Sequence, residues 1–188
     1  RLMCIRDIPE NIDIFTGIDL IGNIKRLFKT PAQMPGCLFL LCIRGNCSIT
    51  IHLSKYELKK NSIAIIFPHQ FVQVMEESND CRFIFVGFSK KLIQSPPLFS
   101  RIIEYNPSIF EKPVIELRPE VAEIFYEYFK VLTKAMRLPN SFIKDEQADL
   151  ICSQLIMGLG NIYKLGESND RPHYNRNQEI VKELVRVV

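Results

Sequence analysis

The sequence predicts a mainly β domain that is followed by α-helices, and two observations lead to this fold class. From about residue 12 to residue 88, short segments rich in Ile, Val and Phe alternate with turn residues at intervals typical of an all-β barrel or sandwich. After residue 118, apolar residues recur every three or four positions, which is the spacing of amphipathic helices. With 188 residues, of which 47% are hydrophobic, the chain has enough apolar material for one core.

Six strands are predicted in the first part, and the residues between them suit turns. A tight hairpin is assigned to Arg44-Gly45-Asn46, exposed turns to residues 59–62 and 78–80, and a corner to residues 68–70. We expect the strands to form a small barrel. They are predicted at residues 12–15, 37–43, 47–53, 63–67, 71–75 and 82–88.

The second part begins with proline-containing connections at residues 95–97 and 106–107. A short amphipathic segment at residues 98–105 and one more strand at 114–117 come first. Pro119 then suits the first turn of a helix, and the apolar spacing continues to about residue 136. Residues 138–141 break this helix, and a second helix is predicted over residues 142–163.

The second helix carries two apolar stripes, whereas a helix on the surface of a monomer needs only one. Either the helix lies between the barrel and the first helix, or one side contacts a second copy of the chain. We expect an antiparallel homodimer contact about a two-fold axis. One stripe is Ala148, Ile151, Leu155, Leu159 and Ile162, and the other is Ile143, Leu150 and Met157. The predicted interface residues are Ala148, Ile151, Leu155, Met157, Leu159 and Ile162.

The last residues of the chain predict the beginning of a further helix. Residues 175–179 offer a side-chain cap, and an apolar stripe at helical spacing runs from Ile180 to Val188. A helix of this length is marginal alone in water. We therefore expect the sequence to stop just inside a second domain.

Charge and cysteine usage restrict the partners and the location. The 24 Lys and Arg against 21 Asp and Glu leave a net charge of +3, and no segment concentrates it, so direct DNA binding is not expected of these residues. No run is long and apolar enough for a membrane span, and no signal-peptide pattern is found at the start. The six cysteines are expected to be reduced and mostly buried in a cytoplasmic protein. The regular spacing of Cys37, Cys42 and Cys47 invites a metal interpretation, but separate strands around a turn explain it better.

The order of these parts resembles the N-terminal half of AraC-type transcription regulators. The local texture that carries the resemblance is Arg44-Gly45 at the end of a strand, the run from residue 58 to residue 68, and the strand at 83–89 that leads into residues 90–93. The resemblance implies a cupin-like β-barrel at 1–118, a two-helix dimerisation segment at 119–165 and a linker at 166–175. Residues 176–188 would then begin a helix-turn-helix DNA-binding domain, and the chain would sense a small-molecule effector.

The cupin resemblance also permits a test for a metal centre. When the metal-binding pattern of cupins is anchored on Gly45, its two His positions fall on Ile51 and Leu53 and its Glu position on Glu57. Anchoring the later pattern on Pro68 places Gln73 at the third His position. Aliphatic side chains offer no lone pairs to an ion, so neither a metal nor another cofactor is expected.

The remaining candidate site is the barrel interior. The predicted lining is Cys47, Ile49, Ile51, Leu53, Gln73 and Phe85, mostly apolar with a polar contact, as in small-ligand pockets. The alternative is an interior simply filled by these side chains. No catalytic residues are predicted, because His52, His69 and His173 are expected in exposed positions, and we expect a sensor, not an enzyme. The alternatives from other classes are a stand-alone cupin-like enzyme that uses non-metal residues such as Glu57, and a small-molecule carrier.

Overall fold

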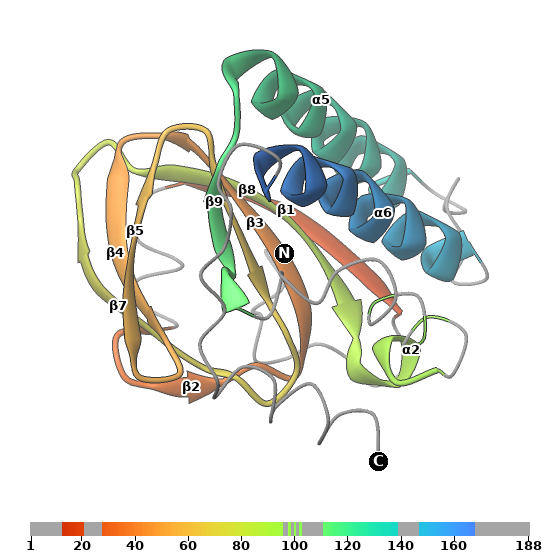
Figure 1. Ribbon diagram of the computed structural model, residues 1–188, viewed down its shortest axis with the longest axis horizontal. Helices are drawn as coiled ribbons and strands as arrows, with labels where there is room; N and C mark the ends of the chain where they lie inside the picture. Colours follow the sequence, from red (N-terminus) through yellow and green to blue (C-terminus); the bar gives the residue numbers. More distant parts are fainter. Residues whose placement is uncertain are drawn as a thin grey trace.

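The computed structural model describes residues 13–20, 28–95, 111–138 and 147–167, together with residues 98, 100 and 102. Within these residues the chain forms nine strands and three helices. Figure 1 shows their arrangement. The strands are β1 (Ile14–Leu20), β2 (Ala32–Gln33), β3 (Gly36–Arg44), β4 (Asn46–Ile51), β5 (Ser54–Lys59), β6 (Ser62–Ile66), β7 (Phe71–Glu77), β8 (Arg82–Ser89) and β9 (Val114–Glu116). The helices are α2 (Lys90–Ile93), α5 (Pro119–Met136) and α6 (Ala148–Glu167).

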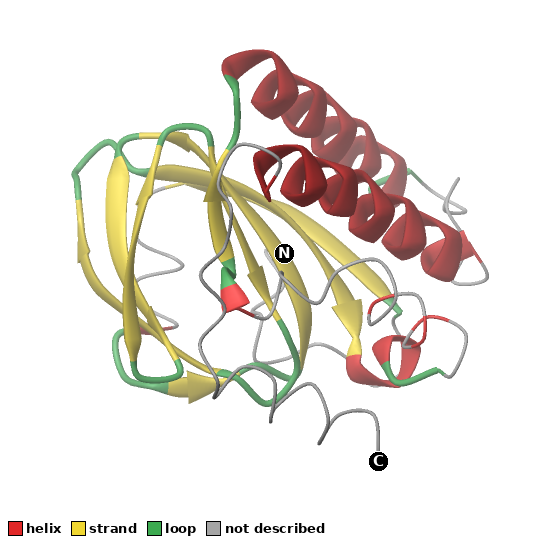
Figure 2. Cartoon of the chain, viewed as in Figure 1, coloured by secondary structure: helices red, strands yellow, loops and turns green. Residues whose placement is uncertain are grey.

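The strands form two antiparallel sheets that face each other. One sheet has the order β1-β8-β3-β6-β9 and the other the order β2-β7-β4-β5. Both helices α5 and α6 lie on the outer face of the five-stranded sheet, where they run side by side in opposite directions (Figures 1 and 2). The predicted fold class, a mainly β domain of cupin-like type with C-terminal helices, is confirmed, although the two sheets do not close into one hydrogen-bonded barrel.

Two hydrophobic cores separate the three layers. Strand β3 is buried on both faces, because it lies in the middle of the five-stranded sheet between the helices and the second sheet. Its odd-numbered residues, such as Phe39, belong to the core under the helices, and even-numbered residues such as Leu40 face the second sheet. We call these the helix-sheet core and the intersheet core.

Helix α5 places one apolar face on the five-stranded sheet. Pro119 occupies its first turn, as predicted, and Ala122, Phe125 and Phe129 are buried in the helix-sheet core. The hydroxyl of Tyr128 donates a hydrogen bond of 2.9 Å to Gln154 Oε1 of α6. The two helices therefore form one layer that is anchored to the β part.

Most of the predicted turns are found, and the main error concerns one hairpin. Gly45 adopts φ +68°, as its place in the predicted tight turn requires. The strand predicted at 47–53 instead ends at Ile51, where His52 turns the chain with φ +46°. Strand β5 then follows; it was missed because Leu58 is its only buried residue, so it shows no apolar run. The short strand β2 was also missed.

The helical predictions are accurate within the described residues. Strand β9 and helix α5 lie where the sequence predicted them. Helix α6 is described from Ala148 and continues to Glu167, four residues beyond the predicted end at 163. The predictions for residues 98–105 and 142–146 fall mostly outside the described residues, and those for the linker and the final helix do so from residue 168 onward.

Candidate functional site

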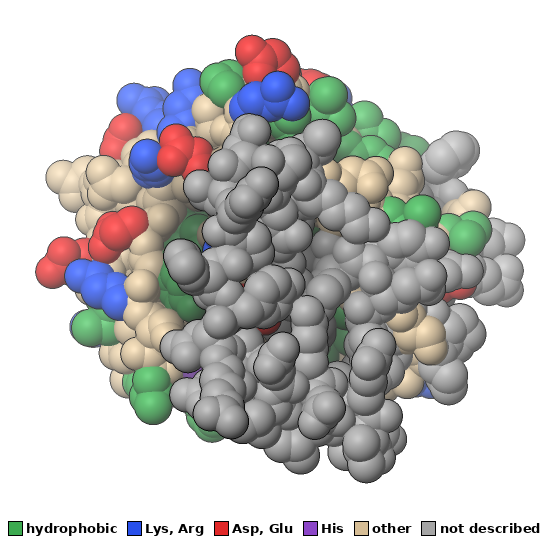
Figure 3. Space-filling model, in the orientation of Figure 1, with side chains coloured by type: hydrophobic (Ala, Val, Ile, Leu, Met, Phe, Trp, Pro, Cys, Tyr) green, Lys and Arg blue, Asp and Glu red, His purple; other side chains and the backbone are tan. Residues whose placement is uncertain are grey.

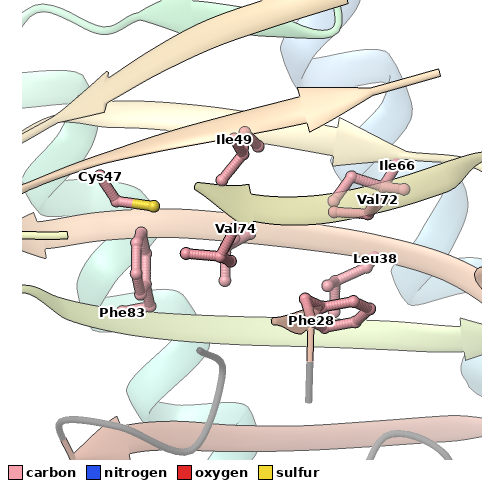
Figure 4. A pocket seen from close by; sticks show the side chains of 9 residues that line it. Phe28, Leu38, Cys47, Ile49, Ile66, Val72, Val74 and Phe83 are labelled. Carbon is pink, nitrogen blue, oxygen red and sulfur yellow. The ribbon is translucent and has the colours of Figure 1, made fainter. Parts of the chain in front are cut away.

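The side chains that the structure describes in the intersheet core enclose little free volume. A residual cavity of about 10 Å³, the space of a single water molecule, lies at its centre (Figure 4). Figure 4 shows the lining side chains converging on one another from both sheets. Among the described residues, these side chains therefore fill the centre of the interior, which agrees with one of the two alternatives that the sequence left open. The lining residues are Phe28, Leu38, Leu40, Cys47, Ile49, Ile66, Val72, Val74 and Phe83.

Four of the six predicted lining residues face this interior. Cys47 and Ile49 line the cavity, and Ile51 is buried in the same core at one end of β4. Phe85 lies on the correct face of β8 but is only partly buried, and its ring packs 6.4 Å from that of Phe15. Contact of these side chains with a ligand stays a prediction.

The orientations predicted for Leu53 and Gln73 are wrong. The turn at His52 removes Leu53 from the strand alternation, so its side chain is fully exposed. On β7 the neighbours Val72 and Val74 point inward, and the intervening Gln73 therefore points outward. Its Nε2 donates a hydrogen bond of 3.1 Å to the Lys29 carbonyl.

The residues that an enzyme interpretation would use lie outside the interior. Glu57 has a side chain that is 65% exposed, and its Oε1 lies 3.7 Å from Lys55 Nζ. His69 is exposed in a turn, as predicted, and His52 is exposed, as predicted, but in a turn and not on a strand. Within the described residues, no three His, Cys, Asp or Glu side chains are grouped so as to hold a metal ion.

A larger cleft lies between the end of the five-stranded sheet and α5. Its volume is about 310 Å³, at the lower end of the range for small-molecule sites. The β part contributes the end of β3, the turn between β5 and β6, and the start of β8, while α5 contributes one turn. The lining residues are Leu41, Cys42, Ile43, Arg44, Lys60, Asn61, Arg82, Ala122, Glu123 and Tyr126.

This cleft is positively charged. Its lining contains three cationic side chains, those of Arg44, Lys60 and Arg82, and one carboxylate, that of Glu123. Arg44 Nε also lies 3.2 Å from Asp80 Oδ2, and both side chains are at least half exposed, so water screens this pair. Hydrogen bonding from the Ser78 hydroxyl, together with Arg44, lowers the pKa of Asp80. Besides Arg44, the cleft therefore offers Lys60 and Arg82 as hydrogen-bond donors for an anionic ligand.

Main-chain hydrogen bonds fix the floor of the cleft. Asn61 adopts φ +72°, and its N–H donates to the Cys42 carbonyl at 2.9 Å. The N–H of Lys60 donates to the Gly45 carbonyl at 3.1 Å, so the two turns that carry Arg44 and Lys60 are tied together. Sequence reasoning missed this cleft because its cations come from separate turns and no local motif joins them.

The two stripes of α6 have different environments. Ala148, Leu155 and Leu159 are buried in the helix-sheet core, and Ile151 and Ile162 pack against it. In the other stripe Leu150 and Met157 are exposed at 63% and 42%, and Ile143 lies outside the described residues. Of the predicted interface residues, Met157 alone points outward, and the other five contact the chain itself.

Helix α5 extends this exposed apolar surface. Ile124 and Val131 on α5, and Leu138 two residues beyond its end, follow one another at seven-residue steps and are more than half exposed. Hydrophobic side chains gather over the helical layer in the view of Figure 3. We call Ile124, Val131, Leu138, Leu150 and Met157 the outer helical face. None of the described helices combines the length and the apolar character of a membrane span.

Comparisons with known proteins give limited similarity. No model of a known protein family matches the chain, and no curated protein matches it in sequence. Among solved structures, apo ToxT K231A from Vibrio cholerae strain SCE256 has 10% identity and a TM-score of 0.46, with 94% of this chain and 65% of ToxT covered. A cupin 2 conserved barrel domain protein from Leptotrichia buccalis has 21% identity and a TM-score of 0.29, with 32% and 29% covered. The Cnp3 cupin domain of Schizosaccharomyces pombe has 12% identity and a TM-score of 0.36, with 45% and 62% covered.

These structures belong to the two groups that the sequence pattern resembles, since ToxT is an AraC-family regulator and the others are cupin proteins. The chain spans less than two thirds of the length of each of these three proteins. At these identities and TM-scores the similarity concerns the arrangement of strands and helices and identifies no ligand or partner.

Proposed function

We propose that this chain is the ligand-sensing and dimerisation part of an AraC-type bacterial transcription regulator, without catalytic activity of its own. Its effector would control a helix-turn-helix DNA-binding segment that follows the described residues, in a cytoplasmic protein. The observation that carries the proposal is the cleft between the β part and α5, because the same helix bears part of the outer helical face. A ligand in the cleft would touch the helix that also meets a second copy.

The charge of the cleft supports an anionic effector. Arg44, Lys60 and Arg82 can donate charge-assisted hydrogen bonds, each worth about 1.5–3 kcal/mol. The ring of Tyr126 and the side chains of Leu41 and Ile43 supply an apolar wall. This combination suits a small carboxylate or phosphate ester that carries an apolar part.

The outer helical face supports the dimer. Four exposed apolar side chains on two adjacent helices, together with Leu138 just beyond α5, are available to be buried against the same five of a partner, as a two-fold contact requires. The hydrogen bond between Tyr128 and Gln154 holds the two helices together. A displacement of α5 by a ligand would thus reach both parts of the contact surface.

Titration of the isotope-labelled protein with citrate, octanoate and inorganic phosphate at constant ionic strength tests the cleft. We expect saturable NMR shift changes at Lys60, Arg82 and Tyr126 with at least one of these anions. Lys60→Gln and Arg82→Gln should each weaken that binding by about tenfold or more, which corresponds to one charge-assisted hydrogen bond.

The matched control is Lys55→Gln, which removes an exposed lysine outside the cleft lining. It should leave the affinity unchanged. Shift changes that are absent for all three anions, or that Lys60→Gln and Arg82→Gln leave intact, would remove the cleft from the proposal.

Reading the gene beyond the codon for Val188 tests the regulatory assignment separately. About 90 further codons that encode two helix-turn-helix units are expected. A stop codon within one or two helical turns would instead favour the stand-alone enzyme or carrier.

A further inference from the structure

The cleft between the five-stranded sheet and α5 divides its charges by element. The β part contributes the cations Arg44, Lys60 and Arg82, while α5 contributes the carboxylate of Glu123 and the ring of Tyr126. We call these two parts of the lining the sheet side and the helix side. The sheet side therefore supplies only positive groups, and the one negative group belongs to the helix side.

The opposite charges of the two sides do not meet. Among the residues that the structure describes, no ion pair joins Glu123 to a cation of the sheet side. Arg44 pairs instead with Asp80, which is not part of the cleft lining. The charges of Lys60, Arg82 and Glu123 are thus available to a molecule that lies between the two sides.

Main-chain contacts fix the helix side relative to the sheet side. Strand β9 leads into α5 and pairs with β6, which follows the turn that carries Lys60. Just before the helix, the N–H of Leu117 donates a hydrogen bond of 2.9 Å to the Asn61 carbonyl in that turn. The start of α5 is therefore attached to the floor of the cleft, and the placement of the two sides follows from the backbone.

The lysine of α5 beside Tyr126 already has a carboxylate partner. Lys130 Nζ lies 2.6 Å from Glu127 Oε1 and 4.9 Å from the centroid of the Tyr126 ring. Glu123 and Tyr126 lie one helical turn apart and are neighbours on the helix surface. An ammonium group in the cleft would therefore find the Glu123 carboxylate unpaired next to an aromatic ring.

This charge pattern does not suit a purely anionic ligand. The sheet side attracts a carboxylate, but Glu123 repels any negative charge placed in the same cleft. An ammonium group on the same ligand changes this repulsion into an attraction. Leu41 and Ile43 in the lining can accept an apolar substituent, and the volume of about 310 Å³ restricts the ligand to a small molecule.

We infer that the effector is a small zwitterion, namely an amino acid with an apolar side chain. Its carboxylate accepts hydrogen bonds from Lys60 and Arg82 on the sheet side, and its ammonium group donates to Glu123 on the helix side. Such a molecule bridges the β part and α5. The inference rests on the function proposed for the same cleft, which by itself requires only an anionic group.

Two pairs of ligands that differ only in the ammonium group test this inference. L-Leucine is compared with 4-methylpentanoate, and L-phenylalanine with 3-phenylpropanoate, by NMR titration of the isotope-labelled protein at neutral pH and constant ionic strength. In at least one pair the amino acid should bind about fivefold more tightly than its amine-free counterpart, as expected of a solvent-exposed charge pair.

Glu123→Gln separates the charge of this residue from its place in the structure. The exposed glutamate is replaced by a side chain of the same shape, so the fold should be retained. Binding of the amino acid should weaken by about fivefold, whereas the amine-free counterpart should bind as well as before or more tightly. A merely structural role would change both affinities in the same direction. The matched control is Glu120→Gln on the same helix, an exposed residue outside the cleft lining, which should change neither affinity.

The possible outcomes distinguish this inference from the proposed function. Equal affinities within both pairs, or an equal effect of Glu123→Gln on both members, would overturn the zwitterion and leave an anion-binding cleft. Binding of citrate, octanoate or phosphate without binding of either amino acid would overturn it as well. Shift changes at Lys60, Arg82 and Tyr126 that are absent for every one of these compounds would remove the cleft itself.

Discussion

Opposite outcomes are expected from a charge at Met157 and a charge at Leu155. Both residues belong to α6, and they lie two positions apart. Met157 is 42% exposed on the outer helical face, so Met157→Glu should change the free energy of unfolding of the monomer by less than about 0.5 kcal/mol. Leu155 is 3% exposed in the helix-sheet core, where an unpaired carboxylate costs several kcal/mol of a total stability of about 5–15 kcal/mol.

In the proposed dimer the same Met157→Glu carboxylate would be buried at the contact. A cost of about 3 kcal/mol weakens association by more than 100-fold. Sedimentation velocity at about 1–100 μM measures the association, since this range covers dimers with a micromolar Kd. Thermal unfolding followed by circular dichroism measures the stability of the fold separately. We expect a folded monomer for Met157→Glu and an unfolded or strongly destabilised chain for Leu155→Glu.

The control for these substitutions is Phe71→Glu. Phe71 is a similarly exposed apolar residue, but it lies on the four-stranded sheet and not on the helices. This variant should remain dimeric. The dimer assignment is wrong if the wild type sediments as a monomer at tens of micromolar, or if Met157→Glu stays as dimeric as the control.

Three further predictions concern packing, metal and DNA. In urea unfolding, Gly87→Ala should lower the free energy of unfolding by about 1–3 kcal/mol, because the added Cβ would overlap the buried ring of Phe15. Gly158→Ala on α6 should raise it by up to about 1 kcal/mol, because the added Cβ has no neighbour within 4 Å. Equal effects of the two substitutions would contradict the packing described. Elemental analysis after dialysis should find no stoichiometric Zn, Fe or Mn, because Ile51, Leu53 and Gln73 occupy the would-be imidazole positions; about one ion per chain would refute this. Residues 1–188 should retard duplex DNA only non-specifically, with a Kd of around 10⁻⁴ M or weaker at physiological salt; sub-micromolar, sequence-dependent retardation would show that these residues read DNA themselves.

The sequence by itself determined the fold class, most strand positions and the helix α5. These features depend on local signals, namely short apolar runs between turn residues, Gly45 in a tight turn and Pro119 in a first helical turn. The same signals failed for β5, where a mostly exposed edge strand carries no apolar alternation. They also misplaced Leu53, because His52 turns the chain and Leu53 therefore no longer follows the inward–outward alternation of β4.

Only the tertiary structure decided which surfaces are free. Both stripes of α6 consist of apolar residues in the sequence, but packing against the five-stranded sheet buries one of them and leaves Leu150 and Met157 of the other exposed. The positive cleft joins side chains from separate turns of the chain, as Arg44 with Lys60. No local pattern encodes such neighbours, because strand order and register, and not spacing along the chain, set the distance between them.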